Sequence, residues 1–115
     1  MAVKRIVPDF QTRDPAASRD FYADVLGLDV VMDLGWVVTF ASADAPHAQI
    51  TLMTNDATAP EQPDASIEVD DVDAAYAAVQ RLDYEIVYPI TDEAWGVRRF
   101  FVREPSGKVL KILSH

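Results

Sequence analysis

The sequence predicts a single α+β domain built from two successive βαβββ units, and three observations carry this prediction. A chain of 115 residues has the common size for one domain with its own hydrophobic core. Half of its residues are hydrophobic and a quarter are charged, which is typical of a globular protein. The order strand, helix and three strands occurs twice, in residues 1–54 and 64–115, on either side of a proline-containing linker at 55–63.

The first unit opens with a short apolar-rich strand at 5–12. It stops at Asp14-Pro15, a helix N-cap followed by a proline suited to the first helical position. Apolar residues then recur at helical spacing over 16–26, and Gly27 is placed to end this helix in a left-handed conformation. β-branched and apolar stretches predict three further strands, at 28–32, 36–41 and 48–53.

The second unit repeats this order. A strand at 66–69 precedes the caps Asp70-Asp71 and a helix at 73–82, and three strands follow at 85–88, 98–103 and 108–113. The tight-turn sequence Pro105-Ser106-Gly107 joins the last two strands as a hairpin. Because each unit is too small to be a separate domain, we expect one curved, mostly antiparallel sheet, a cup with both helices on its outer face.

Strand alternation predicts which side chains face the helices. In the first strand Ile6, Pro8 and Phe10 fall on one side, while Val7, Asp9 and Gln11 fall on the other. We expect the apolar sides to pack beneath the helices and the polar sides to line the cup. A solvent-facing sheet surface explains the pattern about as well as a binding cup does. The other apolar positions are Ile50, Leu52, Ala65, Ile67, Val69, Leu110 and Ile112.

Charge and composition exclude several classes of function. The 19 acidic residues outnumber the 10 basic ones, and the net charge of −9 repels nucleic acid and anionic membranes. The absence of cysteine excludes disulfides, thiolate zinc sites and cysteine nucleophiles. No stretch has the pattern of a signal peptide or a membrane span, so we expect a cytoplasmic protein.

Two segments carry a resemblance to a known family. The first is R-D-P-A-A-S-R-D-F-Y at 13–22, with V-L-G-L at 25–28, and the second is W-G-V-R-R-F-F-V-R-E-P-S-G at 95–107. Together with the repeated βαβββ pattern, they resemble the vicinal-oxygen-chelate superfamily of glyoxalases, bleomycin-resistance proteins and extradiol dioxygenases. Glu104 stands where the antibiotic-binding branch usually has aspartate. The resemblance covers nearly the whole chain.

The resemblance also implies where a metal would bind. Enzymes of this superfamily hold a divalent metal with His or Glu on four strands, at positions that correspond here to Val7, Thr51, Asp64 and Lys111. Only Asp64 could bind a metal, and such sites need three or more suitable ligands. We therefore expect no metal and no other cofactor.

No alternative catalytic motif is present, and no catalytic residue is assigned. His47 lies in a predicted turn and His115 is the last residue, so both are interpreted as solvated surface histidines. Asp9, Asp64 or Glu68 could serve as a general base if burial raised its pKa.

The resemblance favours a protein of the bleomycin-resistance type, which sequesters a small molecule without changing it. Trp95 lies in a loop that closes over the ligand in such relatives, although a packing role explains it equally well. Acidic residues of the cup would favour a cationic aromatic ligand. The candidate ligand-binding residues are Asp9, Gln11, Trp36, Phe40, Thr51, Met53, Asp64, Glu68, Trp95, Arg98 and Lys111.

Two other functions remain open. One is an isomerase, lyase or dioxygenase of the same superfamily, and the other is an interaction module without a small ligand. Relatives cover the apolar rims of the sheet with a second chain, so we also expect a homodimer. Since a lone lysine is expensive to bury, we expect Lys111 to pair with Asp9, Asp64 or Glu68.

Overall fold

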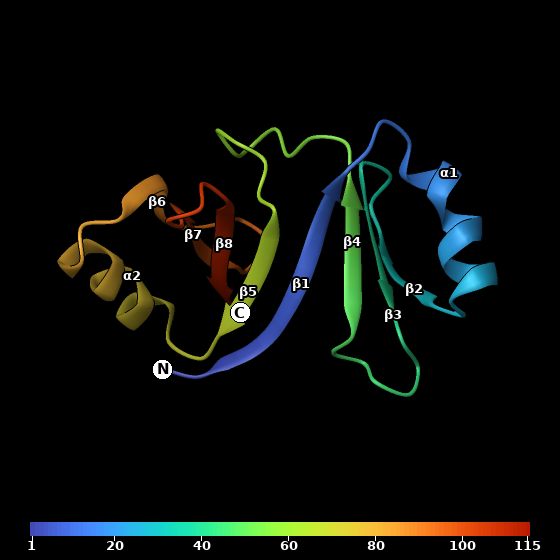
Figure 1. Ribbon diagram of the computed structural model, residues 1–115, viewed down its shortest axis with the longest axis horizontal. Helices are drawn as coiled ribbons and strands as arrows, with labels where there is room; N and C mark the ends of the chain where they lie inside the picture. The colour runs from blue at the N-terminus through green and yellow to red at the C-terminus, as the bar shows by residue number, and fades with distance from the viewer. The chain divides into compact units, whose positions relative to one another are not determined.

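The computed structural model describes all residues, 1–115, and the chain divides into two compact units. Residues 7–58 form one unit, here called the first unit. Met1–Ile6 and Ala59–His115 form the other, here called the second unit. Both contain the predicted order of strand, helix and three strands, which confirms the α+β class and the two βαβββ repeats (Figure 1).

The first unit contains a four-stranded sheet with the order β2-β3-β4-β1. Strand β1 pairs in parallel with β4, whereas β2 with β3 and β3 with β4 are antiparallel. The elements are β1 (Val3–Gln11), α1 (Pro15–Asp20), η1 (Phe21–Val25), β2 (Asp29–Asp33), β3 (Val37–Ala41) and β4 (Gln49–Met53).

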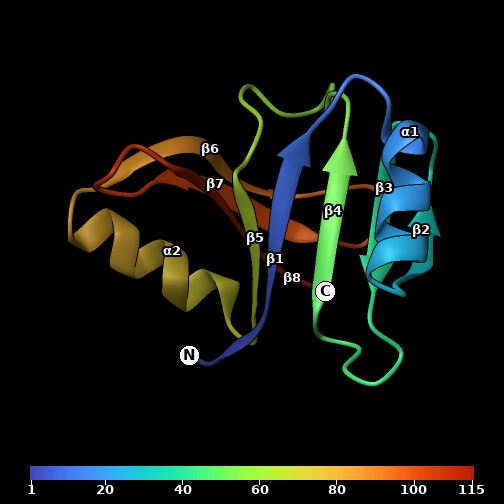
Figure 2. The ribbon, with the colours of Figure 1, turned by 45° about the vertical axis from the view of Figure 1, so that its right-hand side comes forward.

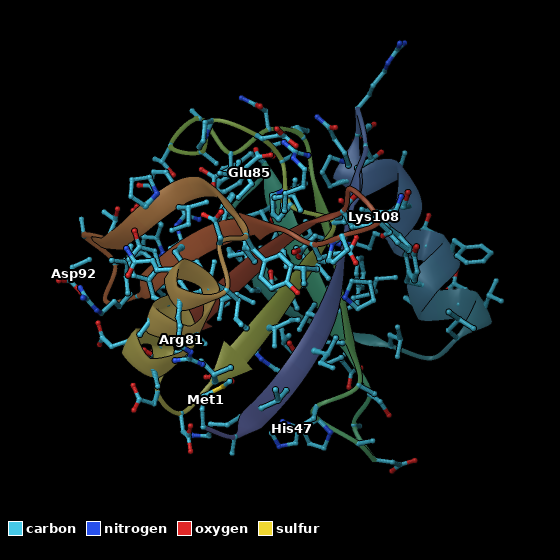
Figure 3. The ribbon with its side chains drawn as sticks, turned by 60° about the vertical axis from the view of Figure 1, so that its left-hand side comes forward. Met1, His47, Arg81, Glu85, Asp92 and Lys108 are labelled. Carbon is cyan, nitrogen blue, oxygen red and sulfur yellow. The ribbon has the colours of Figure 1, made fainter.

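The second unit has the equivalent sheet, with the order β5-β8-β7-β6 and helix α2 along one face (Figure 2). Strands β5 and β8 are parallel, and the other two pairs are antiparallel. Figure 3 labels Glu85 and Asp92, the two ends of β6. The elements are β5 (Ala65–Val69), α2 (Val72–Arg81), β6 (Glu85–Asp92), β7 (Arg98–Arg103) and β8 (Val109–Ser114).

The helices begin where the sequence predicts. Asp14 directly precedes α1, and its carboxylate accepts the backbone N–H groups of Ala16 and Ala17 in the first turn. Asp71 directly precedes α2, and its carboxylate accepts the backbone N–H of Ala74. The predicted first helix is in fact two segments, because the α-helical turns of α1 pass into the π-helical η1. Neither α1 nor α2 is long and apolar enough to cross a membrane.

The core of the second unit lies between α2 and one face of its sheet. Val72 and Ala75 of α2 pack with Phe100 and Val102 of β7, and Tyr76 meets the Phe100 ring edge to face at 4.9 Å. Four of the five predicted inward residues of β5 and β8 join this cluster, all but Ala65, which agrees with the alternation in these two strands. They are Ile67, Val69, Leu110 and Ile112.

The core of the first unit is smaller, and part of its predicted packing is wrong. Tyr22 of η1 covers Phe40 and Leu52, and Ile50 also joins this cluster as expected. Phe10 lies beside Leu52 on the same face but is 49% exposed. The helical segment contributes one ring to the cluster and leaves β1 uncovered, so Phe10 does not pack beneath it. Pro8, predicted to do the same, is also exposed, and so is Ile6, the last β1 residue of the second unit.

Glu104 closes the hairpin between β7 and β8. Its carboxylate accepts the Ser106 hydroxyl and, at 3.0 Å, the Lys108 backbone N–H, while Gly107 has a φ of +93°. These two hydrogen bonds, the hydroxyl first, hold the pKa of Glu104 below its usual value. A glutamate can therefore hold this turn together.

Removing the hydroxyl donor should release part of this effect. In S106A we expect the pKa of Glu104 to rise toward its unfolded value, because the carboxylate loses its main hydrogen-bond donor. Since the folded pKa is the lower one, the hydrogen bond stabilises the fold above the unfolded pKa and is lost as the pH falls through the folded pKa. Carboxylate NMR titration of S106A beside the wild type measures the shift, and an unchanged Glu104 titration contradicts it.

Candidate functional site

The candidate site is built on the face of the second unit's sheet that lies opposite α2. Phe100 and Val102 of β7 face the helix, so alternation puts Arg99 and Phe101 on the other face. Lys111 of β8 is the cross-strand partner of Phe101, so its side chain belongs to the same face. This face therefore combines cationic and aromatic side chains.

Arg99 lies in a cage of three aromatic rings. Its guanidinium carbon is 5.5 Å from the ring centroid of Tyr88, 5.2 Å from that of Trp95 and 5.1 Å from that of Phe101. All three distances fall within the range of cation–π attraction. Arg99 is only 2% exposed, so the attraction acts with little competition from water.

A carboxylate completes this cage. Arg99 Nη2 lies 3.6 Å from Glu93 Oε2, and both side chains are almost fully buried. The Tyr88 hydroxyl donates a 2.6 Å hydrogen bond to Glu93 Oε1. We call Tyr88, Glu93, Trp95, Arg99 and Phe101 the Arg99 cage. It provides three rings and one carboxylate around one cation.

The Trp95 loop is held by its own backbone as well. Glu93 N–H donates to Val97 O at 2.7 Å, and Gly96 N–H donates to Glu93 O at 3.1 Å. Gly96 has a φ of +87°, a conformation that favours glycine. Trp95 is nevertheless 55% exposed, so the loop presents an indole ring that is supported from within by Arg99.

The acidic residues predicted for this unit have partners within it. The Asp64 carboxylate accepts the Val109 backbone N–H at 2.8 Å. Glu68 forms an ion pair with Arg5 at 3.3 Å, and its carboxylate lies 3.6 Å from His115 Nε2. The predicted pairing of Lys111 stays a prediction.

Arg98 is placed differently from the expectation of a ligand-binding residue. It shares the face of Phe100 and Val102, where it binds Asp73 of α2 at 2.8 Å and Asp92 at 3.0 Å. These contacts, with Asp73 the larger contributor, raise the pKa of Arg98 and lower that of Asp73. The arginine that faces the site is its neighbour, Arg99.

The first unit holds the other predicted residues on two faces of its sheet. Asp9 and Thr51 are cross-strand partners and both are buried, and the Thr51 hydroxyl lies 2.8 Å from that of Thr39. Met53 is buried on the same face as its partner Gln11. Gln11 also lines an open depression of about 470 Å³ with Thr12, Arg13 and Thr54.

Phe40 corrects the sequence-based expectation. It is fully buried and stacks on Tyr22 at 5.0 Å, because the alternation of β3 turns it with Val38 toward the helical segment. A ligand on the opposite face of the sheet cannot reach it. Trp36, immediately before β3, is partly exposed and its carbonyl accepts the Thr54 backbone N–H.

The residues at the four family metal positions do not fit a metal. Val7 has no donor, the Thr51 hydroxyl is bonded to Thr39, and Lys111 is a cation. No three His, Cys, Asp or Glu side chains gather closely enough to hold a metal ion. Asp64 alone cannot hold one.

Sequence reasoning missed Tyr88, Glu93 and Arg99. A usable signal was present, because the hairpin at Pro105-Ser106-Gly107 fixes the register of β7 against β8. With Leu110 and Ile112 correctly placed toward the helix, that register assigns Arg99 to the opposite face. No sequence signal brings Glu93 there, since its position depends on the turn that follows β6.

The comparisons with known proteins agree with this architecture. The sequence of residues 3–112 matches the family model of the glyoxalase/bleomycin resistance protein/dioxygenase superfamily. Among curated proteins, none matches the chain.

Three solved structures show the same fold at low identity. A superfamily member from Vibrio splendidus 12B01 has a TM-score of 0.75 and 19% identity, over 99% of this chain and 100% of its own. A protein from Legionella pneumophila described as an NAD-dependent benzaldehyde dehydrogenase has a TM-score of 0.75 and 18% identity, over 95% and 97%. The Mn(II)-bound glyoxalase from Novosphingobium aromaticivorans has a TM-score of 0.67 and 22% identity, over 97% of this chain and 38% of its own.

Proposed function

Because the chain belongs to the glyoxalase/bleomycin resistance protein/dioxygenase superfamily, we propose that it binds a small aromatic molecule and leaves it unchanged. One observation carries the proposal: Trp95 is an exposed indole ring on a fixed loop. Aromatic rings stack well on such a surface, and little ordering is needed when the ring is already in place.

The contacts of Trp95 support a binding role over a packing role. A packing tryptophan is mostly buried, whereas Trp95 has the Arg99 guanidinium against its ring and is still 55% exposed. Phe101 and Tyr88 lie beneath the same guanidinium, so the cage is a rigid base for the loop. A ring that is held in this way is available to stack on a planar ligand.

We expect W95A to weaken the binding of a planar aromatic ligand by about 1 kcal/mol or more, because stacking on the indole is lost. A panel of planar aromatic compounds is first screened by quenching of tryptophan fluorescence. The affinity of each hit is then measured by calorimetry in the wild type and in W95A.

W36A is the matched comparison, since Trp36 is the only other tryptophan and is also partly exposed. Equal weakening in both variants points to nonspecific adsorption and contradicts the proposed site. A larger loss in W36A moves the ligand to the first unit.

A metal-dependent enzyme of the superfamily is the second candidate, and the Mn(II)-bound glyoxalase is its reason. The donor set of this chain argues against it, since Val7 and Lys111 offer no ligand where the enzymes have His or Glu. Purified protein that carries stoichiometric metal and turns over a glyoxalase or dioxygenase substrate overturns the binding function.

We also propose a cytoplasmic homodimer. The first unit exposes the apolar side chains of Phe21, Val25 and Leu26 in and directly after η1, and that of Val31 on the edge strand β2, and a second chain could cover them. Light scattering at micromolar concentration is expected to give about twice the 12.8 kDa chain mass. A clean monomer refutes the dimer and leaves the ligand proposal untouched.

A further inference from the structure

The Arg99 cage contains the groups that proteins use to bind an organic cation, and its own arginine occupies them. Three rings surround the guanidinium at 5.1–5.5 Å, and Glu93 supplies the counter-charge. We propose that Arg99 is the specificity-determining residue of the site: it fills the cation position, so that Trp95 accepts planar rings that carry no positive charge. This inference rests on the proposed binding function and names its ligand class.

The two faces of the Trp95 ring are not equivalent. The π-electrons of an aromatic ring attract a cation at either face. When a cation already lies against one face, the attraction for a second cation at the other face is weaker. A ligand cation stacked on the outer face would also be repelled by Arg99 through the thickness of the ring. A neutral ring or an aromatic anion meets neither penalty.

The carboxylates that could compensate a ligand cation are already engaged. Glu93 is buried, and it is shared between Arg99 and the Tyr88 hydroxyl. Glu68 is paired with Arg5, and Asp64 accepts the Val109 backbone N–H.

The net charge of −9 acts in the opposite direction, because it attracts cations to the protein as a whole. That attraction is long-range and is screened beyond about 8 Å at physiological ionic strength. The contact between Arg99 and Trp95 is short and largely shielded from solvent, so it is screened much less. Charge selectivity at 0.15 M salt therefore reports the local effect.

Three probes with the same ring test the inference: naphthalene-2-carboxylate, naphthalene-2-carboxamide and 2-naphthylmethylammonium. Calorimetry at about 0.15 M salt gives each affinity, and the indole N–H resonance of Trp95 reports contact. In the wild type we expect the carboxylate and the carboxamide to bind about fivefold or more tightly than the ammonium, as two cations separated by one ring repel each other.

R99Q should reverse this order, because it empties the cation position and leaves the three rings and Glu93. R99K keeps the charge and should keep the wild-type order, which separates the effect from a general disturbance of the fold. R98Q is the matched control: it removes the same charge from the next residue, whose guanidinium binds Asp73 and Asp92 on the helix face. It should not change the order.

Each result has one meaning. If none of the three probes binds the wild type, the proposed function fails. If the ammonium binds the wild type most tightly, the function stands and the role of Arg99 is wrong. If R98Q reverses the order as R99Q does, overall charge controls selectivity and the inference is overturned. Should R99Q fail to fold, the wild-type order and R99K still decide.

Discussion

F40A is expected to lower the free energy of unfolding by about 3–5 kcal/mol. Phe40 is fully buried, stacks on Tyr22 at 5.0 Å and packs against Val38 and Leu52. Removing the ring leaves a cavity in a small core, where few other side chains can move to fill it. Urea denaturation followed by circular dichroism measures the loss.

F10A provides the comparison on the same face of the same sheet. Phe10 lies beside Leu52 but is half exposed, so its truncation should cost less than about 1 kcal/mol. Equal losses in F10A and F40A would mean that β1 is covered in solution. If F40A were as stable as the wild type but no longer bound the ligand, Phe40 would be a ligand-binding residue after all.

E93A should have an effect of similar size in the second unit, about 3–5 kcal/mol, because it removes the Glu93 carboxylate from a buried ion pair with Arg99. Removing both charges in E93A/R99M should cost less than the two single changes together, since each single change loses the same Arg99–Glu93 interaction. Urea denaturation of the four proteins gives the coupling free energy directly.

D92A is the control for this cycle. Asp92 precedes Glu93 and is also paired with an arginine, Arg98, but its side chain is 76% exposed. An exposed ion pair stabilises a fold by about 0–1 kcal/mol, so D92A should be close to the wild type. Additive effects of E93A and R99M would show that the two charges act independently, against the geometry of the cage.

Most of the fold was predictable because its signals are local. Asp14-Pro15 and Asp71 mark helix starts through hydrogen bonds within one turn, and the two-residue period of β5 and β8 correctly separates their faces. Such signals depend on a few neighbouring residues and do not require knowledge of what packs above the sheet.

The errors came from features that depend on more distant parts of the chain. Alternation gives Phe10 the correct face, but only the reach of the helical segment decides whether that face is covered, and there it is not. Alternation alone also does not decide which residues of β7 face the helix, so it cannot distinguish Arg98 from Arg99 as the arginine of the site. The register against β8, together with the turn that brings Glu93 back, was needed to find the cage.

Met1–Ile6 belong to the second unit, whose other residues lie at the opposite end of the sequence. Ala2 exchanges two hydrogen bonds with Asp70, at 2.7 and 3.0 Å, and Arg5 pairs with Glu68. A ribosome makes these N-terminal residues before every other part of that unit, so they must wait until β5 has emerged. Contacts between such distant positions slow folding. Cutting the chain at its linker would also separate Met1–Ile6 from the rest of the second unit, so the C-terminal fragment would lack these residues.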